Sequence, residues 1–462
     1  MTARPPGGPV RHGPAGSDPA RTDPARATAY RLLRAVDEAG AYANLALPKL
    51  LTEARVTGRD AAFATDLGYG TLRAAGTLDT ILSRCVDRSP EDIEAAVRDL
   101  LRLGAYQLLR TRVPAHAAVA TTVDLTREVG RGRATGFVNA VLRRVAARSW
   151  DEWMAQLSSG LPAVDALAVR TAHPAWIAAA FAGALGGDLA EAERALRADD
   201  ARPVTHLVAW PGGSTRAELL AAAPGAEFGP YSPYAVRLDG GGNPEAIAAI
   251  RERRAGVQDE GSQLCALALT EPPLDGPDER WLDLCAGPGG KAALLAALAA
   301  QRGAKLVANE LREHRARLVR QATGFWGVDV RIGDARTFPA DERGYDRVLL
   351  DAPCTGLGAL RRRPEARWRR RPDEVATLSA LQCELLRSAL RLARPGGVVA
   401  YVTCSPHLAE TVEVVAQVAA GRDLLAARTA LPATPGLANG PTAQLWPHRH
   451  GTDAMFLALL RC

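Results

Sequence analysis

The sequence has few lysines, few aromatic residues and no closely spaced cysteines. Only three of its 57 basic residues are lysine, and aromatic residues make up 5% of the 462 positions. The seven cysteines lie far apart and no Cys-x-x-Cys pair occurs, which disfavours both a cysteine-bound zinc site and a disulfide framework. Because reduced cysteines are typical of the cytoplasm, we expect a cytoplasmic protein that binds no metal.

Long apolar stretches are also missing. No run of about 18 apolar residues occurs, so no membrane-spanning helix is expected. The first residues lack the charged-then-apolar pattern of a secretion signal. Six prolines without apolar periodicity predict a disordered tail over residues 1–27. The apolar content of 47% is nevertheless ordinary for a globular protein, and the length allows about three domains.

Apolar spacing divides the remaining chain into three regions. Residues 28–150 show helical periodicity and no strand signals, which predicts an all-α bundle. Residues 160–240 are less regular, and a strand at 206–210 with a helix at 216–223 indicates a small α+β (RRM-like) domain. From 245 to 462 short apolar runs alternate with helical stretches. This alternation predicts a doubly wound, Rossmann-like α/β domain with a mostly parallel sheet.

Five strand candidates and three helices carry the prediction for the third region. The strands are 281–285, 305–309, 328–332, 347–351 and 398–403, and the helices are 291–302, 311–323 and 372–394. A Gly-rich run at 240–244 is predicted to be a linker or loop. Ligands of open parallel sheets bind beyond the carboxyl ends of the strands. Residues at those ends are therefore the first candidates for a functional site.

The first of these strands runs into a glycine-rich turn. Residues 283–291 read Asp-Leu-Cys-Ala-Gly-Pro-Gly-Gly-Lys, and the glycines let the backbone approach a ligand ahead of a helix N-terminus. A phosphate-binding P-loop is excluded, because Cys285 and Ala292 replace its first glycine and its hydroxyl residue. A loose dinucleotide fingerprint and an S-adenosylmethionine site both remain possible.

Acidic residues at three successive strand ends favour the S-adenosylmethionine site. These acids are Asp283, Glu310 and Asp334. Glu310 follows the second strand, where a carboxylate accepts hydrogen bonds from ribose hydroxyls. Asp334 follows the third strand, where it can accept from an adenine amine. Such acids also cap helices in many proteins, so the set of three carries more weight than any one of them.

Two further strand ends carry thiols. Residues 351–358 read Asp-Ala-Pro-Cys-Thr-Gly-Leu-Gly and residues 403–406 read Thr-Cys-Ser-Pro. Asp351, Cys354 and Cys404 should therefore converge near the cofactor. This set suits methylation of carbon 5 of a pyrimidine, because a thiolate that adds to carbon 6 makes carbon 5 nucleophilic. An acid at ring nitrogen 3 supports the charge shift. The residues alone do not decide which thiol attacks.

A basic segment follows the Cys354 turn. Residues 361–371 contain seven arginines and one glutamate, a charge equal to the net +6 of the whole chain. Concentrated arginine with an aromatic residue predicts contacts to RNA phosphates and bases. The candidate RNA-binding residues are Arg361, Arg362, Arg363, Arg367, Trp368 and Arg369. The alternative is a helix start with a buried tryptophan.

The motifs resemble those of the RNA cytosine-5 methyltransferases of the Sun/Fmu type. Segments 283–291, 351–358 and 403–405 resemble the catalytic motifs, and 256–264 and 448–453 resemble the lead-in and closing segments. Segments 63–73 and 136–144 resemble the NusB-like N-terminal domain of the bacterial RsmB branch. That branch modifies one cytosine of 16S ribosomal RNA. The resemblance covers about residues 28–462 and implies a NusB-like bundle before the catalytic domain.

The resemblance also implies a role for each motif. Cys404 would be the nucleophile, Cys354 would help to release the product, and Asp351 would contact ring nitrogen 3. S-adenosylmethionine would be held by Cys285, Ala286, Gly287, Pro288, Gly289, Gly290, Lys291, Glu310, Arg315, Asp334 and Asp351. The implied substrate is small-subunit ribosomal RNA, and a monomer is expected. Gly287 departs from the family pattern, which usually has alanine there.

Three alternatives remain at this point. A DNA cytosine methyltransferase would use the thiol of a Pro-Cys motif, here Cys354, as its nucleophile. A nicotinamide-dependent oxidoreductase would fit the glycine-rich turn, although it leaves both thiol turns unexplained. A non-catalytic RNA-binding factor would fit the NusB-like region alone.

Overall fold

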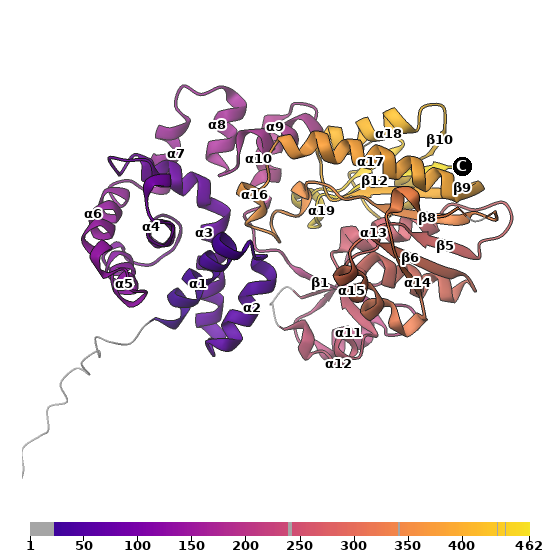
Figure 1. Cartoon of the computed structure of the whole chain (residues 1–462), viewed down its shortest axis with the longest axis horizontal. Coiled ribbons are helices and arrows are strands. Elements are labelled where there is room, and N and C mark those ends of the chain that lie inside the picture. The colour runs from indigo at the N-terminus through magenta and orange to yellow at the C-terminus, as the bar shows by residue number, and fades with distance from the viewer. Residues whose placement is uncertain (1–22, 239–242, 341, 432, 439) are drawn as a thin grey trace, which may run out of the picture. The chain divides into compact units, whose positions relative to one another are not determined.

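The computed structural model describes residues 23–238, 243–340, 342–431, 433–438 and 440–462. The chain divides into two compact units. The first comprises residues up to 41 together with 45–68 and 82–147, and the second comprises 42–44, 69–81 and 148–462. Each unit is described separately, and its elements can be followed in Figure 1.

The first unit is built from helices. They are α1 (Pro24–Ala39), α2 (Ala43–Glu53), α3 (Gly58–Ser83), α4 (Ala95–Arg110), α5 (Ala115–Glu128) and α6 (Thr135–Val145), with the start of α2 and the middle of α3 assigned to the second unit. Leu32, Leu100 and Leu142 are fully buried. Each belongs to an apolar series that recurs at helical spacing in the sequence. The predicted all-α bundle is confirmed.

The predicted disordered tail is wrong for its last residues. Helix α1 begins at Pro24, and the Asp23 side chain caps it by accepting hydrogen bonds from the Ala25 and Arg26 amides, each at 3.1 Å. An aspartate followed by proline is a helix start signal, which the overall proline content of the segment obscured. Residues 1–22 of the predicted tail lie outside the described residues.

The second unit begins with four helices and a small sheet. The helices are α7 (Trp150–Ser158), α8 (Ala163–Arg170), α9 (Ala175–Ala184) and α10 (Leu189–Ala198). The sheet contains β1 (Thr205–Ala209), β2 (Glu227–Phe228), β3 (Ala235–Leu238) and β4 (Ala255–Val257), all antiparallel in the order β2-β3-β1-β4. Helices α11 (Arg216–Ala222) and α12 (Ala248–Arg251) complete it. Strand β1 and helix α11 confirm the two elements predicted here.

The small sheet extends past the predicted domain boundary. Strand β4 pairs with β1, although the catalytic domain was expected to begin at residue 245. The expected boundary followed the glycine-rich run at 240–244, of which 239–242 lie outside the described residues. A turn-forming run marks a change of direction, and the strand after it can return to the same sheet. Strand β4 therefore belongs to the small sheet, although it follows the expected boundary at 245.

The large sheet follows the predicted α/β pattern. Its strands are β5 (Arg280–Asp283), β6 (Lys305–Glu310), β7 (Asp329–Ile332), β8 (Tyr345–Asp351), β9 (Ala393–Thr403), β10 (Asp423–Leu425), β11 (Thr442–Gln444) and β12 (Phe456–Arg461). The order is β10-β12-β9-β8-β5-β6-β7, with β11 paired to β12. Strands β5 to β9 pair in parallel, whereas β12 runs antiparallel to β9. All five predicted strands are observed.

Helices cover both faces of the large sheet. Helices α13 (Glu260–Thr270), α14 (Gly290–Gln301) and α15 (Glu313–Thr323) contribute to one core with Trp281 and Leu349. Helices α17 (Asp373–Leu392) and α18 (Val412–Val418) contribute to the other core with Leu282 and Leu350. Figure 1 shows α17 along the strands. Because neighbouring strand residues face opposite cores, both faces are buried and the doubly wound prediction is confirmed.

Candidate active site

The predicted site residues gather at the carboxyl edge of the large sheet. Asp283 ends β5, Glu310 ends β6 and Asp351 ends β8. Asp334 follows β7 within two residues, and Cys404 follows β9 directly. Parallel pairing places all of these ends on one side, as expected for an open α/β sheet.

The glycine-rich turn passes from β5 into helix α14. Gly289 is the N-cap of α14 and has a φ of 114°, a left-handed conformation that favours glycine. The turn is tied to the next strand, because the Ala286 amide donates to the Asn309 carbonyl at 2.8 Å. The first amides of α14 follow this turn, and helix N-termini attract negative groups.

Glu310 is folded against the glycine-rich turn. Its Oε2 accepts a hydrogen bond from the Gly287 amide at 3.1 Å, and its Oε1 accepts from the Arg312 amide at 3.0 Å. Arg315 donates to the Gly287 carbonyl and lies 3.7 Å from the Glu310 carboxylate. A Cβ atom at position 287 would approach Glu310 Oε2 to 2.2 Å. An alanine at position 287 would therefore require the Glu310 side chain to move.

Asp283 is a buried acid with unmet hydrogen-bonding capacity. The residue has 0% exposure, and neither carboxylate oxygen has a well-formed hydrogen bond. Burial, and next the Asp351 carboxylate, raise the pKa of Asp283 to about 8, whereas the Lys291 charge and the Cys285 amide oppose this rise. Buried polar groups are normally paired, so this carboxylate fits a cationic ligand such as the amine of S-adenosylmethionine.

Asp334 already has hydrogen-bond and ion-pair partners within the protein, besides the adenine contact predicted for it. It caps the turn after β7 by accepting from the Arg336 amide at 2.9 Å, and it pairs with the Arg336 guanidinium at 2.6 Å. The side-chain hydrogen bonds from Arg336 lower the pKa of Asp334. An ionised carboxylate has about four acceptor sites, so Asp334 remains a candidate for an adenine amine.

Lys291 and Asp351 form an ion pair at the centre of the site. Lys291 Nζ lies 2.8 Å from Asp351 Oδ2, and the lysine is buried whereas Asp351 is partly exposed. Burial opposes the charge of Lys291, but the Asp351 carboxylate outweighs it and the pKa of Lys291 is raised. Lys291 therefore contacts Asp351 directly, a pairing that the sequence motifs did not reveal.

The two predicted thiols lie side by side. Cys354 Sγ and Cys404 Sγ are 3.4 Å apart. The hydrogen bond with Cys404, together with burial, raises the pKa of Cys354 well above its ordinary value. The same hydrogen bond lowers the pKa of Cys404, helped by Arg363 and Lys291 and opposed by burial and Asp351. Of the two thiols, Cys404 is therefore the one that ionises more readily.

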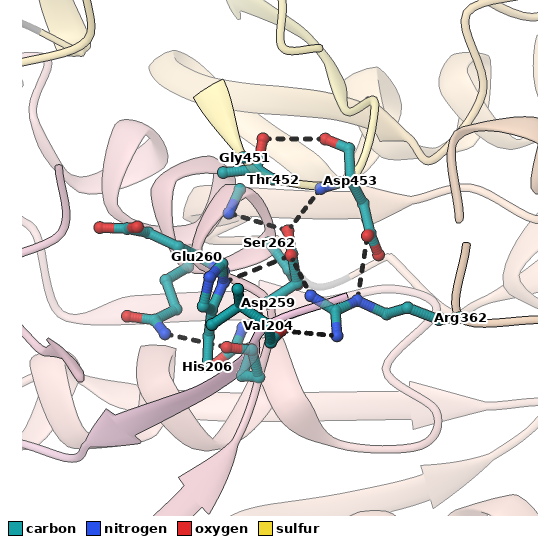
Figure 2. A network of polar contacts seen from close by, with 12 residues as sticks. Val204, His206, Asp259, Glu260, Ser262, Arg362, Gly451, Thr452 and Asp453 are labelled. Carbon is teal, nitrogen blue, oxygen red and sulfur yellow. Dashed lines mark hydrogen bonds and ion pairs between the residues drawn. The ribbon is translucent and has the colours of Figure 1, made fainter. Parts of the chain in front are cut away.

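The burial of Arg361 contradicts its predicted RNA-binding role, and the partly exposed Arg362 is held in ion pairs within the protein. Arg361 is buried and Arg362 is largely covered, and both guanidinium groups bind the Asp259 and Asp453 carboxylates at 2.7 to 3.2 Å. Figure 2 shows Asp259 held between Arg362, His206 and the Gly451–Asp453 segment. Burial alone would raise the pKa of Asp259, but His206 and the two arginines lower it. These positive charges are neutralised inside the protein.

The prediction for Arg367 is also wrong, and Trp368 is half-buried with its indole bonded within the protein. Arg367 has 0% exposure and binds Asp200 at 2.8 Å. The indole of Trp368 donates to the Arg73 carbonyl at 2.7 Å and packs against Gly76. Both residues belong to the short helix α16 (Ala366–Arg369). Arg363 and Arg369 are exposed and stay candidates for RNA contact.

Asp259 and Asp453 are site-supporting residues that sequence reasoning missed. They lie in the lead-in and closing segments, which resemble the family without an assigned role. Asp259 Oδ2 also accepts from the Gly261 and Asp453 amides at 2.9 and 3.1 Å. The sequence offered one indication of this role, because one acid precedes the arginine-rich segment 361–371 and the other follows it, each within a family motif. Only the tertiary structure pairs them with Arg361 and Arg362.

The described residues contain no candidate metal site and no candidate membrane-spanning helix. Nowhere among residues that the structure describes do three or more His, Cys, Asp or Glu side chains form a group that could hold a metal ion. Every helix within those same ranges is too short or too polar to cross a bilayer.

The fold and site define a class of enzyme. A doubly wound sheet with a glycine-rich turn, acids at three successive strand ends and two convergent thiols is a methyltransferase of the S-adenosylmethionine-dependent class. Residues 273–461 match the family model of the 16S rRNA methyltransferase RsmB/F. Residues 23–147 match the NusB family.

Curated relatives extend this match over most of the chain. A protein of Mycobacterium tuberculosis, named as a methyltransferase without a stated substrate, is 54% identical over 94% of this chain and 95% of its own length. The ribosomal RNA small subunit methyltransferase B of Cronobacter sakazakii is 32% identical over 90% of this chain and 94% of its own. The chain therefore belongs to the RsmB/F methyltransferase family, and S-adenosylmethionine is its cofactor.

Solved structures show the same fold. The crystal structure of the protein PH0851 has a TM-score of 0.79 and 24% identity, covering 96% of this chain and 99% of its own. NSun6 from Pyrococcus horikoshii, determined with SFG, has a TM-score of 0.51 and 18% identity, covering 61% and 96%. The family assignment leaves no support for a nicotinamide-dependent oxidoreductase.

We expect Gly287→Ala to weaken S-adenosylmethionine binding about tenfold, because the added methyl group displaces Glu310. Glu310→Asp in the same chain should restore part of the affinity by shortening the side chain. Isothermal titration of the purified protein measures both effects. Gly324→Ala, where an added Cβ meets nothing within 4 Å, is the control. Equal affinities for Gly287→Ala and the wild type would refute the steric argument.

Asp259→Ala should lower the free energy of unfolding of the second unit by about 3 kcal/mol, because it removes one carboxylate from the buried Arg361 and the largely covered Arg362. Denaturant unfolding followed by circular dichroism measures the loss. Asp423→Ala, on the exposed part of β10, should change this free energy by less than about 0.5 kcal/mol. A loss below about 1 kcal/mol for Asp259→Ala would contradict a stabilising role of the Asp259 ion pairs.

The thiol pair predicts ordered alkylation. A lowered pKa leaves more thiolate at any given pH, so Cys404 should react with iodoacetamide about tenfold faster than Cys354 near pH 7.5. The reaction of Cys404 should also persist to lower pH. Peptide mass spectrometry over pH 6 to 9 follows both sites. Burial raises the pKa of Cys265 to about 12, so that cysteine is a slow internal reference. Faster labelling of Cys354 would reverse the assignment.

Proposed function

We propose that this protein transfers the methyl group of S-adenosylmethionine to carbon 5 of a cytosine in small-subunit ribosomal RNA, in the cytoplasm. The observation that carries the proposal is the thiol pair. Cys354 and Cys404 lie 3.4 Å apart at the strand ends that also carry the Lys291–Asp351 ion pair. A methyltransferase that modifies a nitrogen or oxygen atom has no use for two adjacent thiols.

Cys404 is the nucleophile in this proposal. Its lowered pKa favours the thiolate, which adds to carbon 6 of the cytosine and makes carbon 5 electron-rich. Cys354 has the raised pKa and keeps its proton. This difference supports Cys404 over Cys354, the thiol that a DNA cytosine methyltransferase would use.

Asp351 and Cys354 complete the proposed reaction. Asp351 accepts a hydrogen bond from the exocyclic amine of the cytosine, or donates to ring nitrogen 3 when it is protonated, and either contact supports the charge shift when the thiolate adds. Lys291 holds the Asp351 carboxylate in place at 2.8 Å. After the transfer, a base takes the proton from carbon 5, and the carbon 6–sulfur bond breaks so that Cys404 leaves as a thiolate. Cys354, in contact with Cys404, takes this proton after losing its own to solvent, because the Cys404 sulfur carries no charge while it is bonded to carbon 6.

The cofactor occupies the edge between β5 and β7 in this proposal. S-adenosylmethionine supplies an electrophilic methyl group when it is bound. Asp283 holds its amine, Glu310 its ribose hydroxyls and Asp334 its adenine amine. The turn from Cys285 to Lys291 provides the close backbone approach that these contacts need.

RNA as the substrate is supported by the first unit and by the relatives. Residues 23–147 match the NusB family, and relatives over most of the chain are named ribosomal RNA small subunit methyltransferase B. Exposed Arg363 lies close enough to lower the pKa of Cys404, so it is placed to meet a phosphate next to the target base. A cytosine in an RNA loop is also easier to extrude than one in a duplex.

Two variants test the proposed chemistry. Cys404→Ala should abolish methylation, a loss of at least about 10³-fold, because no thiolate remains to activate carbon 5. Cys354→Ala should still attack but release slowly, so a covalent protein–RNA adduct should accumulate on denaturing gels. Bisulfite sequencing of ribosomal RNA from cells that carry each variant locates the methylated cytosine. Normal methylation by Cys404→Ala would refute the mechanism.

A further inference from the structure

Glu410 is a buried carboxylate that the proposed reaction does not use. It ends the short turn η7 (Leu408–Glu410), six residues after Cys404, and its exposure is 0%. Buried glutamates are rare and need several hydrogen-bond partners. The partners of Glu410 come from both thiol turns.

The first set of partners belongs to the Cys354 turn. Glu410 Oε1 accepts a hydrogen bond from the Thr355 amide at 2.8 Å. Glu410 Oε2 accepts another from the Thr355 hydroxyl. Thr355 directly follows Cys354, so this carboxylate fixes both the backbone and the side chain beside that thiol.

The second partner belongs to the Cys404 turn. The Ser405 hydroxyl donates to Glu410 Oε2 at 2.6 Å, and Ser405 directly follows Cys404. The Thr355 and Ser405 hydroxyl oxygens lie 3.2 Å apart. Each thiol is therefore one residue away from a group that binds the same carboxylate.

Glu410 is itself held by the elements on either side of it. The Gln382 side chain donates to Glu410 Oε1 at 3.2 Å and to the Pro353 carbonyl at 2.8 Å. The Tyr401 hydroxyl donates to the Glu410 carbonyl at 2.7 Å. Gln382 lies on α17 and Tyr401 on β9. The carboxylate cannot shift without breaking these contacts.

We propose that Glu410 is a positioning residue that sets the separation of the Cys354 and Cys404 sulfur atoms. It bridges Thr355 and Ser405, and so keeps both thiols within reach of one pyrimidine ring. The catalytic consequence rests on the proposed function, whereas the geometric claim does not. Side-chain length should matter more than charge, because two separate turns must be reached at once.

Two substitutions separate length from charge. Glu410→Asp keeps the charge but is one methylene shorter, so it cannot reach both turns. Glu410→Gln keeps the length, and its amide oxygen can still accept from Thr355 while the hydroxyls rotate to accept from its nitrogen. Glu413→Gln, at an exposed position on α18, is the matched control.

Disulfide formation reports the distance between the sulfur atoms without requiring catalysis. Diamide oxidises two neighbouring thiols by taking one hydrogen from each, which forms one S–S bond and reduces diamide to its hydrazine. The rate of the Cys354–Cys404 disulfide is followed in the full-length protein by peptide mass spectrometry. Methyl transfer is measured in parallel as kcat and as KM for S-adenosylmethionine, and folding by the melting temperature.

We expect Glu410→Asp to form this disulfide about tenfold more slowly than the wild type and to lose about 10²-fold in kcat, with KM for S-adenosylmethionine within about twofold. Glu410→Gln should stay within about threefold of the wild type in both rates, and Glu413→Gln should match the wild type. If Glu410→Asp does not fold, Ser405→Ala removes one contact and should slow the disulfide about threefold.

Wild-type disulfide rates in Glu410→Asp, or in Ser405→Ala if the former does not fold, would overturn the positioning role. A Glu410→Gln variant as slow as Glu410→Asp would overturn it as well, because charge rather than length would then matter. Failure of the proposed function has a different signature. The disulfide would still depend on Glu410 in a protein that adds no methyl group to cytosine.

Discussion

The active site depends on the parallel pairing of β8 with β5 and β9. Because these strands run in the same direction, their ends bring Asp283, Asp351 and Cys404 to one edge of the sheet. The chemistry follows from the short distances that result. Lys291 pairs with Asp351, and Cys354 hydrogen-bonds to Cys404. A slip of one residue in either strand would turn these side chains to opposite faces.

Buried charge around this edge is compensated in two ways. Asp259 is matched by the arginines that follow the Cys354 turn, and Glu410 is surrounded by hydroxyl and amide donors. Asp283 differs, because its carboxylate is buried without a well-formed hydrogen bond. An uncompensated buried acid is costly, and a cationic ligand would satisfy it. This contrast distinguishes Asp259 and Glu410, whose charges are compensated within the protein, from Asp283, whose charge is not.

Much of the fold and part of the site could be predicted from the sequence. The five strand candidates, the helices between them and the thiol turns are observed, because apolar periodicity and turn chemistry are local properties. Prediction failed where the environment of a residue depends on partners far away in the sequence. The arginine-rich segment has the composition of an RNA-binding surface, yet Arg367 is neutralised by Asp200 in the folded chain. Glu410 carried no local signal at all, because its importance comes from Thr355, 55 residues earlier.

The sequence by itself determined the order of the elements, the glycine-rich turn and which residue types stand at the strand ends. These follow from neighbouring residues, whose spacing sets backbone conformation. The tertiary structure alone decided which arginines of 361–371 face solvent, which strand joins the small sheet and which thiol ionises first. Burial, pairing and pKa depend on groups that meet only when the chain is folded, as Cys354 and Cys404 do across 50 residues.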